Sequence, residues 1–381
     1  MPLPASRLLP FRIEFGPRAV DDMRRRIEEF RWPHLGYDSG WATGTSDRVL
    51  RDLVRTWVRD FDWSRVQAAL NERAHVRGEI EGEAMHAMVS AGPAAEHRVP
   101  LLMIHGWPST FADFLDVAHL LGRPDEAGRA FDTVVPSLPG FGFSDAARSP
   151  GMHPGRIAER LHALMRALGY RRYGVHGGDW GAIIGTALAL QHPEAVIGLH
   201  LHHAPGRPEP AGGPPLSDTE RAYLDGLRQF RAEESGYVAI QGTRPQSLAY
   251  AQNDSPVGLL AWMLEKYWAW SDHGDDLWTA VDRDRVLTNA TLYWLTGTAL
   301  SAMRIYYERA HAREAFLDGF VQVPTGFIRF PRDPWGAPRE LVARSYHLVR
   351  YVEAERGGHF AAIEQPAALA GDVRAFFAGL A

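Results

Sequence analysis

The sequence predicts an α/β fold: a mostly parallel, doubly wound sheet with a helical lid insertion and an N-terminal helical extension. Three observations predict it. Strand patterns alternate with helical patterns across residues 96–204, as in sheets built from right-handed crossovers. The alternation stops across residues 205–318 and resumes across residues 319–381. Apolar residues at helical spacing fill much of residues 1–95.

The N-terminal segment, residues 1–95, is predicted to pack on the core rather than to form a free domain. Helical spacing of apolar residues marks residues 18–30 and 48–60. Period-two alternation then predicts strands at residues 74–80 and 84–90.

The core of the sheet is predicted in two parts. The first part has strands and helices in turn, at residues 99–104, 110–121, 131–136, 157–168, 173–176, 182–190 and 196–200. The second part adds strands at 326–330 and 346–352 and a closing helix at 366–380. The lid between them begins with a proline- and glycine-rich stretch at 205–215, which is typical of a linker or hinge.

Composition excludes several classes of protein. The net charge of -5 gives no electrostatic case for a nucleic-acid partner. The absence of cysteine excludes disulfides, thiolate zinc sites and a cysteine nucleophile. No apolar run is long enough to predict a membrane span or a signal peptide, so we expect a cytoplasmic protein.

The most informative motif is Gly-Gly-Asp-Trp-Gly at residues 177–181, directly after the strand predicted at 173–176. Its simplest interpretation is a glycine-rich turn in which Asp179 caps the next helix. The same pattern is typical of the nucleophile elbow of α/β-hydrolases, where the exposed tip is usually a serine. Here the tip is Asp179, and this residue is the predicted nucleophile.

An aspartate at this position restricts the chemistry. Attack by a carboxylate on an ester yields an anhydride. Attack on an sp³ carbon yields an ordinary ester, which water can hydrolyse. Asp179 therefore predicts an epoxide or an alkyl halide as the substrate.

A second motif, His-Gly-Trp-Pro-Ser at residues 105–109, follows the strand predicted at 99–104. An ordinary turn would explain it. In an α/β-hydrolase, however, this loop donates one N–H group of the oxyanion hole. We therefore predict that the backbone amides of Trp107 and Trp180 stabilise the oxyanion formed during hydrolysis.

The base and its acid partner are predicted from chain order, which in this fold is nucleophile, acid, histidine. His359 lies between the last predicted strand and the last helix, and a buried structural histidine is the alternative. Asp333 follows the strand at 326–330, where an Asp-Pro turn is the simpler interpretation. Glu340 and Asp318 are less suitably placed competitors.

Opening an epoxide also requires a proton donor, whereas a halide leaves without one. Tyrosine hydroxyls in the lid are suitable because they are neutral at pH 7. Composition leaves the choice open among seven of them: Tyr223, Tyr237, Tyr250, Tyr267, Tyr293, Tyr306 and Tyr307.

Taken together, these segments resemble the microsomal-type epoxide hydrolases, which include the juvenile-hormone epoxide hydrolases and soluble bacterial relatives. The resemblance extends over nearly the whole chain. It rests on residues 10–13, 31–33, 105–108, 139–144, 177–181, 236–237, 240–245, 253–259, 292–294, 323–326 and 356–360.

The resemblance implies an α/β-hydrolase fold and assigns the lid donors to Tyr237 and Tyr306, with the adjacent Tyr307 as the alternative register. It also implies a soluble form, because the chain lacks the N-terminal anchor of the mammalian members. Those members carry glutamate where this chain has Asp333.

The predicted function is hydrolysis of an epoxide to a vicinal diol through an ester on Asp179, with no cofactor and no metal. The alternatives are a haloalkane or haloacid dehalogenase, with halide held by the indoles of Trp107 and Trp180, and a non-catalytic ligand-binding protein. The expected partner is a small epoxide; oligomeric state is left open. Five lid aromatics suggest a bulky or aromatic substrate or else form the lid core: Trp262, Tyr267, Trp268, Trp270 and Trp278.

Overall fold

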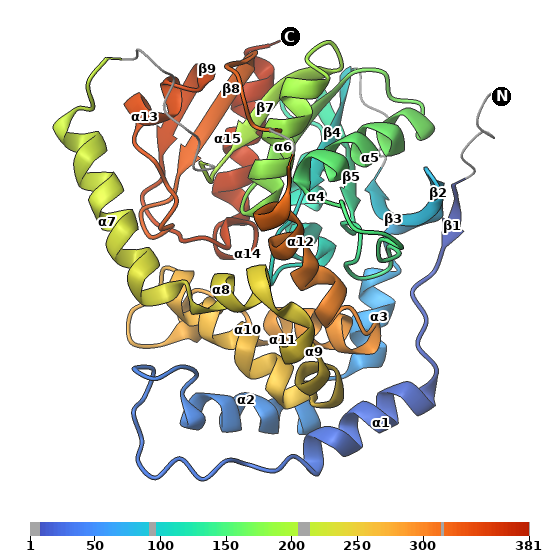
Figure 1. The fold of residues 1–381 in the computed structure, drawn as a ribbon. Coiled ribbons are helices and arrows are strands. Elements are labelled where there is room, and N and C mark those ends of the chain that lie inside the picture. Colours follow the sequence, from blue (N-terminus) through green and yellow to red (C-terminus); the bar gives the residue numbers. More distant parts are fainter. Residues whose placement is uncertain (1–7, 91–96, 205–213, 314–315, 381) are drawn as a thin grey trace.

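The computed structural model describes residues 8–90, 97–204, 214–313 and 316–380 (Figure 1). Most of the stretch predicted as a linker or hinge, residues 205–215, lies outside the described residues.

One sheet organises the described residues, with nine strands in the order β1-β2-β3-β5-β4-β6-β7-β8-β9. The pairs from β5 to β9 are parallel, and β1, β2 and β3 join as antiparallel strands at one edge. This arrangement confirms the predicted mostly parallel sheet. The bounds are β1 Leu9–Phe11, β2 Ala74–Ile80, β3 Glu83–Ser90, β4 His97–Ile104, β5 Arg129–Pro136, β6 Tyr173–Gly177, β7 Val196–Leu201, β8 Val321–Arg329 and β9 Tyr346–Glu353.

The central strands are buried because helices cover both faces of the sheet (Figure 1). All five residues of β6 are buried, as are the last four of β4. The core helices are α4 Leu115–Gly122, α5 Pro154–Ala167, α6 Trp180–Gln191, α13 Arg339–Ala343, α14 Ala361–Glu364 and α15 Pro366–Ala378, with a 3-10 turn at Phe111–Phe114.

The lid consists of helices inserted between β7 and β8. Helix α7 descends along one side of the molecule, and α12 returns between the other lid helices and the core (Figure 1). The bounds are α7 Asp218–Glu234, α8 Gly236–Thr243, α9 Pro245–Asp254, α10 Pro256–Trp270, α11 Arg283–Leu295 and α12 Ala299–His311, with a 3-10 turn at Leu277–Thr279.

The N-terminal segment connects the lid to the sheet. Its helices α1 Pro17–Glu28 and α2 Asp47–Arg59 lie on the side of the lid away from the sheet, and α3 Trp63–Leu70 leads back to β2 (Figure 1). The Trp57 indole donates to Thr291 Oγ1 at 3.1 Å, and the ring of Trp41 stacks on Trp268 at 4.5 Å. These contacts attach the N-terminal segment to the side of the lid that faces away from the sheet.

None of the helices in the described part of the chain combines the length and the apolar character needed to cross a bilayer.

Candidate active site

Asp179 lies at a strained corner between β6 and α6. Its backbone has φ 49° and ψ -129°, and among the described non-glycine residues only Glu81 shares a positive φ. Such a conformation costs about 1–3 kcal/mol and is typical of a nucleophile elbow. The Asp179 side chain makes no capping hydrogen bond to α6, so it is directed to other partners.

Two glycines permit this corner to pack closely. A Cβ at Gly106 would overlap the carboxylate of Asp179. A Cβ at Gly181 would overlap the carbonyl oxygen of Ile104, at the end of β4. The loop after β4 can therefore approach the nucleophile only because both positions lack a side chain.

The carboxylate of Asp179 is held as an anion. The backbone N–H of Trp107 donates to its Oδ1 at 2.7 Å, and Trp180 begins helix α6 immediately after it. Burial opposes ionisation, but hydrogen bonding and charge from His359, together with the Trp107 amide, lower the pKa of Asp179 overall. Its Oδ2 is left to face the histidine.

His359 lies between two carboxylates. Its Nδ1 is 3.1 Å from Asp333 Oδ1, and its Nε2 is 3.4 Å from Asp179 Oδ2. Burial alone would lower the pKa of His359, but the two carboxylates raise it to about 10. The imidazole is therefore protonated in the free protein at neutral pH, and its ring is oriented toward Asp179.

Asp333 is the carboxylate that lies against Nδ1 of His359. It follows β8 and is buried. Burial is the largest single cause and raises the pKa of Asp333, but the charge and hydrogen bond of His359, with smaller contributions from His203 and His202, lower this pKa below its ordinary value overall. The competitors Glu340 and Asp318 are both exposed.

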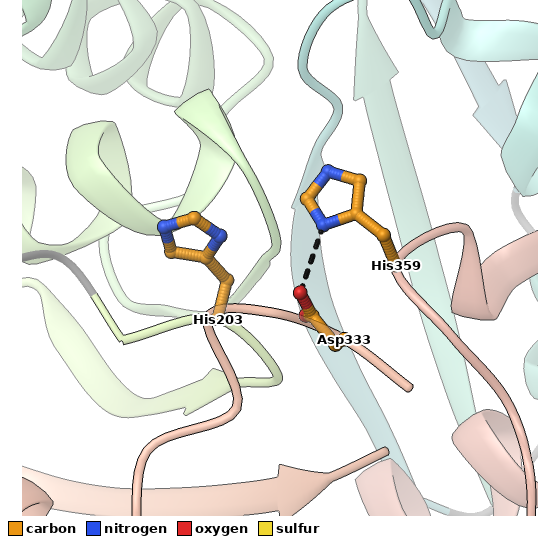
Figure 2. Close-up of side chains that lie close together, drawn as sticks. All are labelled: His203, Asp333 and His359. Atoms are coloured by element: carbon orange, nitrogen blue, oxygen red, sulfur yellow. Dashed lines mark hydrogen bonds and ion pairs between the residues drawn. The ribbon is translucent and has the colours of Figure 1, made fainter. Parts of the chain in front are cut away.

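Figure 2 shows a third group beside this pair, His203, which follows β7. Burial lowers the pKa of His203 to about 4, so this imidazole is neutral. Donor atoms of His203, Asp333 and His359 lie within 4.8 Å of one another, and all three are types that bind metals. The Asp333 oxygen that bonds His359 is already engaged in orienting the ring.

Tyr237 on α8 and Tyr306 on α12 line the same cavity as Asp179. Their ring centroids are 5.7 Å apart, and both rings contact Trp107, at 5.6 and 6.0 Å. The Tyr306 ring meets Trp180 edge-on at 4.5 Å. Within the described residues, neither the Tyr306 hydroxyl nor the Trp180 indole N–H forms a hydrogen bond of ordinary geometry.

Both tyrosines remain neutral. Burial is the main cause that raises the pKa of Tyr237 and Tyr306, and the carboxylate of Asp179 raises both further. Tyr307, the alternative in register, is placed differently: its ring stacks on His311 at 4.0 Å, and it lines a separate cavity.

Two cavities of unequal size meet at Asp179. The larger, about 960 Å³, lies under the lid and is lined by Tyr237, Tyr306, Trp180 and His203 among others. The smaller has a volume of about 30 Å³ and is also lined by His359. The larger is of the size usual for a ligand pocket, and the smaller has room for one or two water molecules.

The five lid aromatics, for which a bulky substrate and the lid core were the two interpretations, do not line the larger cavity. Tyr267 and Trp270 are fully buried, and Trp268 stacks on Trp41 of the N-terminal segment. They therefore say nothing of substrate shape.

Glu364, on α14, is a supporting residue that sequence reasoning missed. Its carboxylate accepts the backbone N–H groups of Gly358 and Phe360, which flank His359, at 3.0 and 2.9 Å. Burial raises the pKa of Glu364 to about 7. This residue fixes the loop that presents the histidine.

Comparison with known families matches both parts of the chain. The family model "Epoxide hydrolase N terminus" covers residues 8–114, and the model "alpha/beta hydrolase fold" covers residues 99–310. The fold and the elbow therefore define an α/β-hydrolase.

Individual relatives narrow this class. Epoxide hydrolase 1 of Sus scrofa is 35% identical over 96% of this chain and 88% of its own length. The crystal structure of juvenile hormone epoxide hydrolase from the silkworm Bombyx mori has a TM-score of 0.89 at 30% identity, covering 98% of this chain and 95% of that one. The structure of Aspergillus niger epoxide hydrolase has a TM-score of 0.87 at 29% identity, with 99% and 97% covered. This chain belongs to the epoxide hydrolase family.

Proposed function

We propose that this protein hydrolyses an epoxide to a vicinal diol through a covalent ester on Asp179. The supporting observation is that the two oxygens of this carboxylate have different partners. Oδ1 accepts the Trp107 amide, Oδ2 faces His359, and two neutral tyrosines line the same cavity. Family membership supports the same reaction.

In the first step, Oδ2 of Asp179 attacks a ring carbon and the carbon–oxygen bond of the epoxide breaks. The departing oxygen takes a proton from Tyr237 or Tyr306. The Tyr306 hydroxyl suits this role because it is buried and forms no hydrogen bond of ordinary geometry with a described residue.

Ester formation prepares the second step. It removes the negative charge of Asp179, which is one of the two carboxylates that raise the pKa of His359. The pKa of the imidazole therefore falls in the intermediate, and its proton can pass to the tyrosinate or to solvent. His359 is then neutral and can act as a base.

In the second step, His359 takes a proton from a water held in the smaller cavity, with Asp333 orienting the ring. Hydroxide adds to Cγ of Asp179, and the oxyanion at Oδ1 binds the amides of Trp107 and Trp180. Collapse breaks the bond between Cγ and Oδ2, and the departing alkoxide takes the proton of the carboxyl group that forms, so the diol leaves and Asp179 returns to its carboxylate. No step calls for a metal or an organic cofactor.

A single turnover in ¹⁸O-water, with enzyme in excess, tests the ester directly. The first diol should be unlabelled because its new oxygen comes from Asp179, and the label should appear in the peptide containing Asp179. Label in that first diol would mean direct attack by water and would overturn the proposal. Asp179→Ala is the control and should give no diol.

The dehalogenase alternative is disfavoured by the tyrosines at the nucleophile and by the names of the reported relatives. Chloride release from a chloroalkane, without epoxide turnover, would restore it. We further propose a cytoplasmic location, which fractionation of the source cells would test.

A further inference from the structure

The larger cavity contains two cationic side chains that the proposed cycle does not use. Arg231, near the end of α7, and Arg309, near the end of α12, both line it together with Asp179. An epoxide and its alkoxide need only the tyrosines, so these guanidinium groups call for another explanation.

Neither arginine has a counter-ion among the described residues. Throughout the described parts of the chain, no carboxylate lies within the 4.0 Å of an ion pair from either guanidinium. Arg231 is exposed at the cavity mouth, whereas Arg309 is half-buried, and burial followed by the charge of Arg231 lowers the pKa of Arg309. A desolvated cation beside another cation is unfavourable unless an anion joins them.

The acidic residues of the cavity do not supply that anion. The Glu234 carboxylate forms an ion pair with the ammonium group of Lys266, with Oε2 at 3.4 Å from Nζ. Asp318 is exposed. Asp179 is paired with His359 at 3.4 Å.

Arg309 is close to the reacting centre. It lies three residues after Tyr306 on α12, so the two side chains share a face of the helix. Three residues correspond to about 4.5 Å along the helix axis. Arg309 also acts on His203, where burial is the main cause of the lowered pKa and the arginine charge is a smaller one. An anion on Arg309 would thus lie near the epoxide oxygen.

The rest of the cavity wall is largely apolar. It includes Leu224, Leu227, Phe230, Val238, Phe316 and Trp335. A ligand that matches this wall and the two arginines has an apolar body and an acidic group.

We propose that the substrate is an epoxide of an apolar carboxylic acid, whose carboxylate binds Arg309 and Arg231 while its epoxide oxygen meets the tyrosines. Arginine suits this role because its planar fork pairs with both carboxylate oxygens. The inference rests on the proposed function, since it names the substrate class of the same site.

The test compares kcat/KM for an epoxy acid and for its primary amide of equal length. The wild-type protein should prefer the acid by about tenfold to a hundredfold, which is the value of a charge-assisted hydrogen bond. Arg309→Met should remove most of this preference. Arg304→Met is the matched control: this exposed arginine on the same helix lies outside the larger cavity, and the preference should persist.

Two results would overturn the inference: equal turnover of acid and amide by the wild-type protein, or an unchanged preference in Arg309→Met. A second measurement needs no variant. The saturated acid of the same length should inhibit the wild-type protein competitively, at a concentration at least about tenfold lower than its amide does. Diol formation without preference refutes only the substrate class, whereas no diol from any epoxide refutes the proposed function.

Discussion

The two sides of Asp179 are built differently. On the side of the small cavity, the groups are already bonded: Asp333 bonds His359, His359 faces Asp179, and Glu364 holds the loop. On the lid side, the Tyr306 hydroxyl and the indole of Trp180 form no hydrogen bond of ordinary geometry with a described residue. The groups that orient His359 are thus bonded without a ligand, although Asp333 Oδ2 and His202 Nδ1 on that side lack partners among the described residues, whereas the two lid-side donors are not bonded.

This difference follows from what each side must bind. Water is always available, so its activation depends on groups held in a fixed geometry. The epoxide oxygen is an acceptor that arrives with the substrate, and a donor bonded to protein would have to break that bond first. We infer that the lid side is incomplete because the substrate completes it.

Replacing His359 should separate ester formation on the lid side from ester hydrolysis on the side of the small cavity most clearly. We expect His359→Gln to lower turnover by about 10⁴-fold, as removal of a triad member does. Attack by Asp179 does not need this base, so the ester should accumulate. Intact-mass measurement should show one added substrate per chain.

The position of that adduct is part of the prediction. Peptide mapping should place it on Asp179, and Asp179→Ala should show none. Loss of turnover without any adduct would mean that both sides depend on the histidine.

Replacing the lid donors should give the opposite pattern. Tyr306→Phe or Tyr237→Phe should each slow epoxide opening by about 10²–10³-fold, the usual effect of losing one oxyanion donor. Single-turnover kinetics should show no accumulated ester, because its formation becomes limiting.

Tyr307→Phe is the matched control for the register of α12. Its ring stacks on His311 and lines a separate cavity, so we expect little change in rate. A large loss in Tyr307→Phe with none in Tyr306→Phe would show that the neighbouring tyrosine is the donor.

Sequence patterns predicted the central sheet because each strand and helix there has its own periodicity. They missed β1, which is only three residues long and depends on its pairing with β2. They also placed the start of β8 five residues late. Pro324 resembles a strand breaker, and the structure accommodates it at a register irregularity opposite β9.

Chain order likewise predicted where Asp179, Asp333 and His359 would lie, since each follows a strand of a parallel sheet. It did not indicate Glu364 or Arg309. These residues lie on helices, and their importance comes from neighbours distant in sequence. No local pattern records such a contact, so only the folded chain reveals it.

Lengthening the side chain at position 333 should slow only ester hydrolysis, the step on the side of the small cavity. The loss should be smaller than in the tyrosine variants. Asp333→Glu shifts the carboxylate by one methylene, and small misplacements of this kind cost up to about 10²-fold. We expect ester hydrolysis to slow by roughly tenfold, while stopped-flow measurement of ester formation stays unchanged. An equal slowing of ester formation would show that Asp333 also affects the lid side.

The smallest expected effect is that of pH on kcat/KM, which reports the free enzyme. The pKa of Asp179 is lowered and that of His359 is raised to about 10, so neither group titrates between pH 6 and 9. We expect kcat/KM to vary by less than about threefold across this range. Because the folded pKa of His359 exceeds its ordinary 6.5, the stabilisation that the ion pair contributes is complete below pH 6.5 and is lost as pH rises toward 10. Glu364, with a pKa of about 7, also titrates in this range, so the profile is measured in Glu364→Gln as well. A limb of kcat/KM near pH 6.5 that persists in this variant would show that the two carboxylates do not hold the proton on His359.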